Sequence, residues 1–584
     1  MRFKLGIRPT IDGRRKGVRE SLEAQTMQMA HSAKQLIESN VFYTDGTPIE
    51  VVIAPQTIGG TKESAICEEF FNENNVVATL TVTPCWCYGT ETMDMNPTTI
   101  KAVWGFNGTE RPGAVYLACA MAGYAQRGLP AFSIYGKDVQ DADSTEIPQD
   151  VQAKILRFAR CAMSVGAMKN KSYLSIGSVS MGIAGSCVNA DFMQKYLGIR
   201  AEWVDMTEVL RRINLGIFDH EEYAVAREWV RNNCPIGEDV NKNPKTKEKL
   251  EEDWDFCVKH ILVCNDLMHG NPKLAEMDWI EESNGKNAIA GGFQGQRAWT
   301  DWLPNADFTE SILNSSFNWN GKKQPSVFAT ENDSLNGISM LLGNLLTQTA
   351  PGFSDVRTYW SPDAVERVTG WKPQGLAENG FIHLINSGAT CLDATGMSIE
   401  NSKNVMKKWW NVTNEDIDAM LKVTNWAPGN LEYFRGGGFS SHFKTMAEMP
   451  ITMLRVNLID GLGPVIQIAE GWTTTLPDNV HKILDERTDK TWPTTWFVPR
   501  LTGKGAFKDV YSVMANWGAN HGAFVYGHIG QDLITLASML RIPVNMHNLN
   551  NKKIFRPHCW SAFGTEDIES SDYRACNNYG ALYK

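Results

Sequence analysis

Two carboxylates and one histidine are the residues of this chain with the clearest capacity for chemistry. Glu331 follows an apolar, β-type run at 326–330, and Asp355 opens a second extended run. Paired carboxylates near strand ends can exchange protons with a substrate. With an imidazole they can also bind a divalent ion such as Mn²⁺ or Mg²⁺, which prefers this donor set to thiolates. His521, in a short polar turn, is the imidazole that we place with them.

Each of these assignments has a purely structural alternative. Asp355 could simply pair with Arg357 or Arg367. An acidic residue inside an extended run opposes β propensity, however, and a residue that breaks a local rule is a candidate for a site. His528 is a second candidate histidine on the same segment as His521. The residues alone therefore leave the identity of the histidine open.

The segment between the two carboxylates predicts how they are positioned. Leucine and isoleucine recur at helical spacing over 335–346, and Asp333 or Ser334 is available as the N-cap. The segment therefore predicts a strand–helix–strand unit. Such a unit would bring Glu331 and Asp355 near each other at neighbouring strand ends.

Three domains are expected from the length of 584 residues and from the change in pattern along the chain. The N-terminal region alternates extended and helical patterns, which indicates a parallel α/β layer. After about residue 347, glycine clusters and short apolar runs favour an antiparallel sheet or barrel. The predicted domains are 1–168, 169–346 and 347–584. In the first domain we expect strands at 3–8, 49–54, 77–83 and 130–135, and helices at 19–37, 62–71, 113–127 and 148–167.

Composition narrows the range of partners. The formal net charge of −10 argues against binding to nucleic acid, which needs basic surface. No apolar run approaches the ~20 residues that cross a bilayer, so no membrane association is expected. The first residues have the pattern of a strand rather than of a signal peptide, and the twelve cysteines are scattered. We therefore expect reduced thiols and a cytoplasmic location.

Tryptophan is abundant, with 19 residues, and several lie in polar, loop-like settings. Indole and phenol rings in such settings can pack against the C–H faces of a sugar while their polar edges form hydrogen bonds. The alternative for any one of them is the hydrophobic core or a subunit interface. The aromatic residues in question are Trp86, Tyr88, Trp104, Trp492 and Trp496.

Long strings of the sequence resemble the L-fucose isomerase family, whose members are metal-dependent aldose–ketose isomerases that often also act on D-arabinose. The least similar stretch is 389–425, which is expected to be a variable surface excursion. The matching strings are GIRP (6–9), DGRR (12–15), TPCWCYG (83–89), WGFNGTERPG (104–113), GFQGQR (292–297), ATENDSLNG (329–337), YFRGGG (433–438) and ANWGANHG (515–522).

The resemblance implies that Glu331, Asp355 and His521 bind Mn²⁺, and that the two carboxylates also act as acid/base groups. It implies two Rossmann-like α/β domains followed by a C-terminal domain that contains a β-barrel. It also implies a homohexamer in which the first domain of a neighbour completes each active site, with Arg8 and Trp86 acting on the neighbour's substrate. Further sugar contacts implied by the resemblance are Gln294, Ser387, Tyr433, Trp492 and Asn520.

The expected reaction is the conversion of L-fucose to L-fuculose, and of D-arabinose to D-ribulose, through an ene-diol. Two other functions fit some of the same residues. A glycoside hydrolase would use Glu331 and Asp355 as its paired carboxylates among tryptophans, without a metal. A non-catalytic sugar-binding protein would need two α/β lobes only. Incubation with free L-fucose, followed by detection of a ketose, separates the isomerase from both.

Overall fold

An open parallel sheet forms the N-terminal part of the computed structural model, which describes residues 2–400 and 404–584. Its strand order is β2-β1-β3-β4-β5, which is one of the doubly wound orders. The central strands are buried almost throughout, because helices cover a parallel sheet on both faces. The strands are β1 (Lys4–Pro9), β2 (Val51–Ile53), β3 (Val76–Thr83), β4 (Ile100–Gly105) and β5 (Ala131–Tyr135).

The helices around this sheet form two groups. α1 contacts α5, whereas α4 contacts α3, which in turn contacts α2. The predicted strands and helices of this region are confirmed, but β4 was missed. Its apolar run is interrupted by Lys101, whose buried ammonium group donates to the Thr99 carbonyl at 2.8 Å. The helices are α1 (Glu23–Asn40), α2 (Thr61–Glu73), α3 (Gly89–Thr92), α4 (Gly113–Gln126) and α5 (Gln149–Met168).

A second parallel sheet follows, with the order β11-β8-β6-β7. The long helix α9 (Lys247–His269) packs against β8. Two parallel sheets confirm the predicted α/β character, and the more specific Rossmann-like description stays a prediction. The strands are β6 (Ser172–Ile176), β7 (Arg200–Val204), β8 (Ala288–Phe293) and β11 (Val327–Ala329).

The C-terminal part contains a closed antiparallel β-barrel, as the sequence predicted. The strands follow the order β16-β19-β12-β13-β18-β17, and β17 pairs again with β16 to close the barrel. β20 adds to β17 in parallel, outside the closed ring. The strands are β12 (Gly352–Trp360), β13 (Phe381–Ile385), β16 (Pro450–Ile459), β17 (Gly463–Thr473), β18 (Thr494–Pro499), β19 (His521–Tyr526) and β20 (Val544–Met546).

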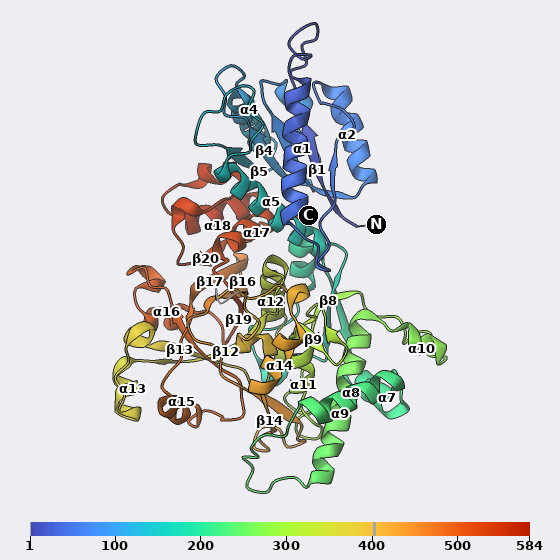
Figure 1. Ribbon diagram of the computed structural model, residues 1–584, viewed down its shortest axis with the longest axis vertical. Coiled ribbons are helices and arrows are strands. Elements are labelled where there is room, and N and C mark those ends of the chain that lie inside the picture. The colour runs from blue at the N-terminus through green and yellow to red at the C-terminus, as the bar shows by residue number, and fades with distance from the viewer. Residues whose placement is uncertain (1, 401–403) are drawn as a thin grey trace.

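One buried helix, α12 (Ser334–Thr347), joins the second sheet to the barrel. It contacts β8 and β11 on one side and β16 and β19 on the other, and it lies at the centre of the molecule in Figure 1. A helix that is apolar nearly all round suits such a position. The predicted strand–helix–strand unit therefore exists, but the prediction that its strands are neighbours was wrong. β11 belongs to the second sheet, whereas β12 belongs to the barrel.

The chain returns to the first domain near its C-terminus. α17 (Gly530–Leu540) packs along α5, and Asp532 accepts hydrogen bonds from Arg157 and Arg160 at 2.8 and 2.9 Å. Figure 1 shows α17 and α18 beside the N-terminal sheet. The remaining elements are α6 (Ala190–Phe192), α7 (Met206–Leu215), α8 (His220–Asn233), α10 (Pro272–Glu276), α11 (Asp307–Asn314), β9 (Phe317–Asn318), β10 (Gly321–Lys322), α13 (Pro362–Thr369), α14 (Asn414–Val423), β14 (Asn425–Pro428), β15 (Phe439–His442), α15 (Asp478–Asp485), α16 (Val510–Asn516) and α18 (Ile568–Tyr579).

The stretch 389–425 is not the surface excursion that the sequence suggested. Its first part is buried, and Asp393 accepts a hydrogen bond from the Ser316 backbone N–H at 2.9 Å. Residues 401–403 of this stretch lie outside the described residues. The excursion was inferred from sequence dissimilarity, which does not report on burial.

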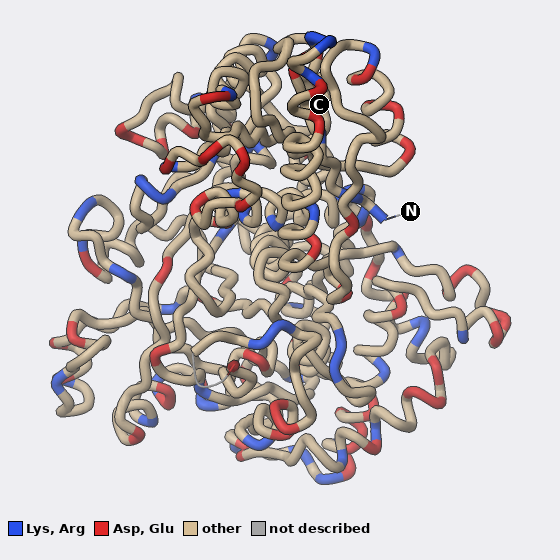
Figure 2. The backbone as a smooth tube through the Cα atoms, turned by 45° about the horizontal axis from the view of Figure 1, so that its top comes forward, with Lys and Arg blue, Asp and Glu red and all other residues tan. Residues whose placement is uncertain are grey.

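The described helices include none that is long and apolar enough to cross a membrane. Figure 2 shows basic residues scattered among acidic ones along the backbone.

Candidate active site

Glu331 lies directly after β11 in an unusual backbone conformation. Its φ is 57° and that of Asn332 is 50°, a left-handed region that costs roughly 1–2 kcal/mol for a residue with a Cβ atom. Asn332 is anchored by hydrogen bonds to Ser175 and to the Ser178 carbonyl. Gly292 permits this turn, because a Cβ there would lie 2.9 Å from Asn332 Oδ1. This strained turn places the buried Glu331 carboxylate just beyond the C-terminal end of β11 in the second sheet.

Asp355 and His521 face each other across a β-ladder. They are direct partners in the antiparallel pairing of β12 with β19. Side chains of such a pair lie on the same face of the sheet. His521 Nε2 is 3.2 Å from Asp355 Oδ1 and 3.5 Å from Glu331 Oε2. The three predicted residues therefore meet where the second sheet abuts the barrel.

Asp333 fixes the orientation of the His521 ring through the Nδ1 atom. Its Oδ2 atom is 2.7 Å from His521 Nδ1 and 2.6 Å from Arg455 Nη1, and its Oδ1 atom caps α12 at the Asn336 N–H. Both Asp333 and Arg455 have fully buried side chains. A carboxylate on one ring nitrogen orients the other nitrogen, which here is Nε2, toward the two remaining carboxylates.

Buried charge dominates the electrostatics. Burial would raise the pKa of Asp333, but Arg455 and His521 outweigh it and hold that pKa at about 2. Burial favours a neutral imidazole, yet the hydrogen bonds of His521 to Asp333 and Asp355 raise its pKa to about 10. Burial raises the pKa of Glu331 to about 7, against the opposing pull of His521. Glu331, Asp333 and Asp355 therefore surround the His521 imidazole, and this arrangement favours a positive charge between them.

This donor set fits a hard divalent ion in its chemistry, although the side chains are not spread around one. Among the described residues, no three or more His, Cys, Asp or Glu side chains are arranged as a ready-made metal site. His521 contacts both Glu331 and Asp355 directly, so an ion held by all three would replace those contacts. Such an ion uses two carboxylates and one imidazole as its ligands. The hydrogen bond at Nδ1 holds the imidazole in the required orientation.

The predicted sugar contacts Asn520, Tyr433 and Trp492 are connected to the three central residues. The Asn520 amide nitrogen is 3.1 Å from His521 Nε2. The Arg357 guanidinium is 3.7 Å from Asp355 Oδ2 and lies over the Trp492 ring, 5.9 Å from its centroid. The Tyr433 and Trp492 ring centroids are 5.4 Å apart. The alternative pairing of Asp355 with Arg357 is therefore observed together with the contact to His521, and does not replace it.

Two further predicted contacts lie in the surrounding loops. Ser387 is buried, and its hydroxyl has no hydrogen-bond partner among the described residues. Gln294, which follows β8, is engaged elsewhere in its own chain, since its Oε1 atom accepts from the Ser178 N–H at 2.7 Å. A sugar contact by Gln294 would use its amide nitrogen. Within the described residues His528, the rival histidine, has no hydrogen bond to the site, and its Nε2 atom lies 2.8 Å from the Gly471 carbonyl oxygen.

Arg8 and Trp86 are in the N-terminal domain, and neither has a contact with the central residues within the described chain. Arg8 is 2% exposed, and its guanidinium donates to Ser64 and to the Thr92 carbonyl. Trp86 is half-buried after β3. Arg14 is more accessible, with 58% of its side chain exposed, and its loop packs against Tyr88 close in sequence to Trp86.

Three supporting residues were missed in the sequence. Gln296 donates to Glu331 Oε1 at 3.3 Å, Asp333 was recognised only as a helix cap, and Arg455 was not singled out. A signal for Arg455 was present, because it is an arginine inside the apolar strand β16. The partner of such a buried charge lies 122 positions away, which no local pattern reveals.

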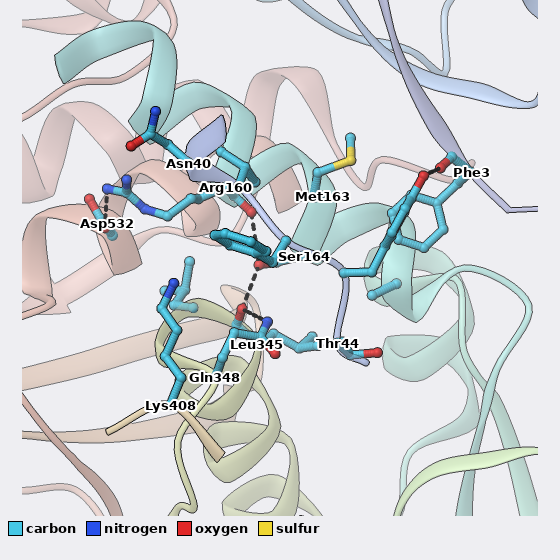
Figure 3. Close-up of a pocket in the computed structure, with 15 residues that line it drawn as sticks. Phe3, Asn40, Thr44, Arg160, Met163, Ser164, Leu345, Gln348, Lys408 and Asp532 are labelled. Atoms are coloured by element: carbon cyan, nitrogen blue, oxygen red, sulfur yellow. Dashed lines mark hydrogen bonds and ion pairs between the residues drawn. The ribbon is translucent and has the colours of Figure 1, made fainter. Parts of the chain in front are cut away.

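The cavity in Figure 3 lies elsewhere, at the far end of α12. It has a volume of about 290 Å³ and is lined by Leu345 and Leu346 of α12, by α1 and α5, and by Lys408. Arg160 points across it to Asp532, as Figure 3 shows. None of the predicted site residues lines this cavity.

Fold and site together define a mixed α/β protein in which two carboxylates and one imidazole meet where the second parallel sheet abuts the barrel. Family models match the chain over most of its length: L-fucose isomerase, first N-terminal domain, at 2–170; second N-terminal domain at 171–348; and C-terminal domain at 384–547. The chain belongs to the L-fucose isomerase family.

Curated relatives match from end to end. The L-fucose isomerase of Bacteroides thetaiotaomicron is 61% identical over 587 residues, and that of Clostridium perfringens is 60% identical over 590 residues. The L-fucose isomerase of Streptococcus pneumoniae (strain JJA) is 60% identical over 583 residues. Each alignment covers 100% of this chain and 99% of the relative.

Proposed function

We propose that this chain is a Mn²⁺-dependent isomerase that converts L-fucose to L-fuculose and D-arabinose to D-ribulose. The observation that carries the proposal is the meeting of Glu331, Asp355 and His521, with His521 anchored by Asp333. The names of the relatives support L-fucose as the substrate. D-Arabinose enters the proposal because the two sugars differ by one methyl group, which a pocket discriminates by only ~1–3 kcal/mol.

In this mechanism, one carboxylate of the Glu331–Asp355 pair removes the proton from C2 of the open-chain aldose. Protonation of O1 gives the ene-diol; the pair then returns a proton at C1 while O2 gives up its hydroxyl proton, so that the aldose becomes a ketose with no net oxidation. Glu331, Asp355 and His521 would hold the ion, and a bound Mn²⁺ supplies Lewis-acid polarisation of substrate oxygens. Asn520, Ser387 and Trp492 would orient the sugar through hydrogen bonds.

Removal of the metal tests the proposal directly. Protein dialysed against a chelator is expected to lose ketose formation from L-fucose, and added Mn²⁺ is expected to restore it. The chelated protein should also unfold at a lower temperature than the Mn²⁺-loaded protein, because an ion that binds only the folded state stabilises it. Full activity in the chelated sample, with no change in unfolding temperature, contradicts the metal assignment.

Arg357 is expected to position both Asp355 and Trp492. In Arg357→Met the apolar stem is retained, but the charge that faces Asp355 and the Trp492 ring is lost. The ring contact of a partly exposed guanidinium is worth about 0.5–1 kcal/mol, so we expect kcat/KM for L-fucose to fall by about twofold to fivefold. Steady-state kinetics measures this. Arg367→Met is the matched control, and an equal loss there contradicts the role of Arg357.

The proposal includes a homohexamer with active sites shared between subunits, in the cytoplasm. In support, neither the half-buried Trp86 nor the exposed Arg14 of the N-terminal domain contacts the described residues of the site in its own chain. All twelve cysteines are free thiols, which suits a reducing compartment. A hexamer of 65.2 kDa chains has a mass of about 390 kDa, which light scattering measures.

Mixing two inactive variants tests whether sites are shared. Trp86→Ala alters the N-terminal contribution, and Glu331→Gln alters the central residues. If a site takes one part from each subunit, dissociating and reassembling the two variants together is expected to restore part of the activity, since some sites then contain two unaltered parts. Each variant reassembled alone is the control. No recovery in mixed oligomers of confirmed mass contradicts sharing.

A further inference from the structure

A polar cavity of about 600 Å³ is lined in part by Tyr433, and it contains none of the three central site residues. Its volume is within the ~300–1,000 Å³ range of small-molecule sites. Segments 240–243, 430–433 and 486–490 line it, and they belong to different parts of the chain. Tyr433 is the one predicted sugar contact among its lining residues.

One wall of the cavity is held in place by internal hydrogen bonds. Asn241 donates to the Gly429 carbonyl at 3.1 Å and accepts from the Leu431 N–H at 2.8 Å. Asn430 donates to Asp489 Oδ2 at 3.0 Å. The loops that carry these residues are therefore fixed to each other before any ligand binds, which lowers the entropic cost of binding.

Other polar groups in the cavity are not engaged. Within the described part of the chain, the side chains of Asn243, Glu432 and Thr488 make no hydrogen bond, and all three line the cavity. Basic Lys242 and acidic Glu486 line it as well. Amides, hydroxyls and charges of both signs favour a neutral ligand with many hydroxyl groups over an anion or a cation.

A row of side-chain contacts joins the cavity wall to the central site. The Tyr433 ring in that wall has its centroid 5.4 Å from that of Trp492, whose buried indole N–H has no partner among the described residues. Arg357 lies over Trp492 and reaches Asp355. Tyr433 is 42% exposed, which leaves ring surface for the C–H face of a sugar.

We propose that this cavity is an outer subsite that binds the closed-ring form of the sugar before its open-chain form reaches Asp355. This inference rests on the proposed function for the identity of the sugar. The chemistry at the central carboxylates requires an open chain, whereas an aromatic face beside a fixed polar wall suits a rigid ring. Asn243 and Glu432 hydrogen-bond the ring hydroxyls, and Tyr433 packs against the ring.

A ring-locked sugar isolates this subsite from the reaction. Methyl α-L-fucopyranoside cannot open and therefore cannot be isomerised. We would titrate it into the Glu331→Gln protein in its oligomeric form, following binding by saturation-transfer NMR and calorimetry. Binding is expected to be kept in Glu331→Gln. In the same background, Asn243→Ala with Glu432→Ala is expected to weaken it by about tenfold, as the loss of two hydrogen bonds predicts.

The matched control is Glu378→Ala with Asn379→Ala. These two residues are of the same types, are adjacent in sequence and exposed, and lie away from the cavity. Equal binding by the control and the cavity variant overturns the proposal, and so does the absence of binding to Glu331→Gln. Because turnover is never measured here, the outer subsite and the isomerase assignment fail independently. Methyl β-D-xylopyranoside binding as tightly as the fucoside would overturn only the choice of sugar.

Discussion

The Glu331→Gln protein is expected to show a kcat for L-fucose about a thousandfold lower than that of the unaltered chain, with its fold intact. A positioned acid/base group contributes about 10²–10⁴-fold, and glutamine keeps the shape of the side chain while removing its charge and its proton transfer. Glutamine is also a weaker partner for the ion that Glu331 is proposed to hold. Ketose formation under saturating substrate and Mn²⁺ measures the effect, and circular dichroism checks the fold.

Glu310→Gln is the matched control for this substitution. Glu310 is buried nearby on α11 and accepts a hydrogen bond from Thr330 at 2.7 Å. Burial raises the pKa of Glu310 to about 8, so the side chain is largely neutral at pH 7 and glutamine resembles it. We expect this variant to keep most of its activity. Equal losses in the two variants, or substantial turnover by Glu331→Gln, contradict the role of Glu331.

The second large effect is expected from Asp333→Ala, in stability. The fully buried guanidinium of Arg455 would lose its carboxylate partner, and breaking a buried pair in this way costs about 3–5 kcal/mol. The variant also loses the cap of α12 and the anchor of His521. Urea titration is expected to show a transition at clearly lower denaturant concentration.

Two further variants separate stability from site chemistry. Asp191→Ala breaks an exposed pair with Lys195 and is expected to change the free energy of unfolding by less than about 0.5 kcal/mol. Asp333→Asn keeps the size of the side chain and is expected to lower Mn²⁺ affinity by about 10–100-fold, as loss of a supporting carboxylate does. A destabilisation by Asp333→Ala no larger than that by Asp191→Ala contradicts this account of the buried pair.

Local patterns predicted most elements of the N-terminal domain. Helical periodicity and β-type runs depend on neighbouring residues only, and they placed α5 and β3 within one residue of their observed limits. Strand β4 was not predicted, because the lysine at position 101, which is buried in the structure, is a residue type that normally indicates surface. The barrel was predicted from glycine clusters and short strands, but its closure by β16 and β17 depends on pairing that no single segment shows.

The sequence also named the three residues at the centre of the site, although through different signals. Glu331 and Asp355 were candidates from their positions at extended runs, whereas His521 was distinguished from His528 only by the resemblance of its surrounding string. The geometry that joins them was predicted incorrectly. A single sheet was expected, and the observed junction uses the end of one sheet and the side of a barrel.

By itself, the sequence determined most helices and strands of the N-terminal domain and made Glu331 and Asp355 candidates for a site, because propensity, periodicity and side-chain type are local properties. The tertiary structure decided that Asp355 stands opposite His521, since a shift of one residue in the β12–β19 register would move His521 to the other face. It also decided that Asp333 and Arg455 form a pair in which both side chains are fully buried. Both depend on contacts between distant segments, which form only when the second sheet and the barrel pack around α12.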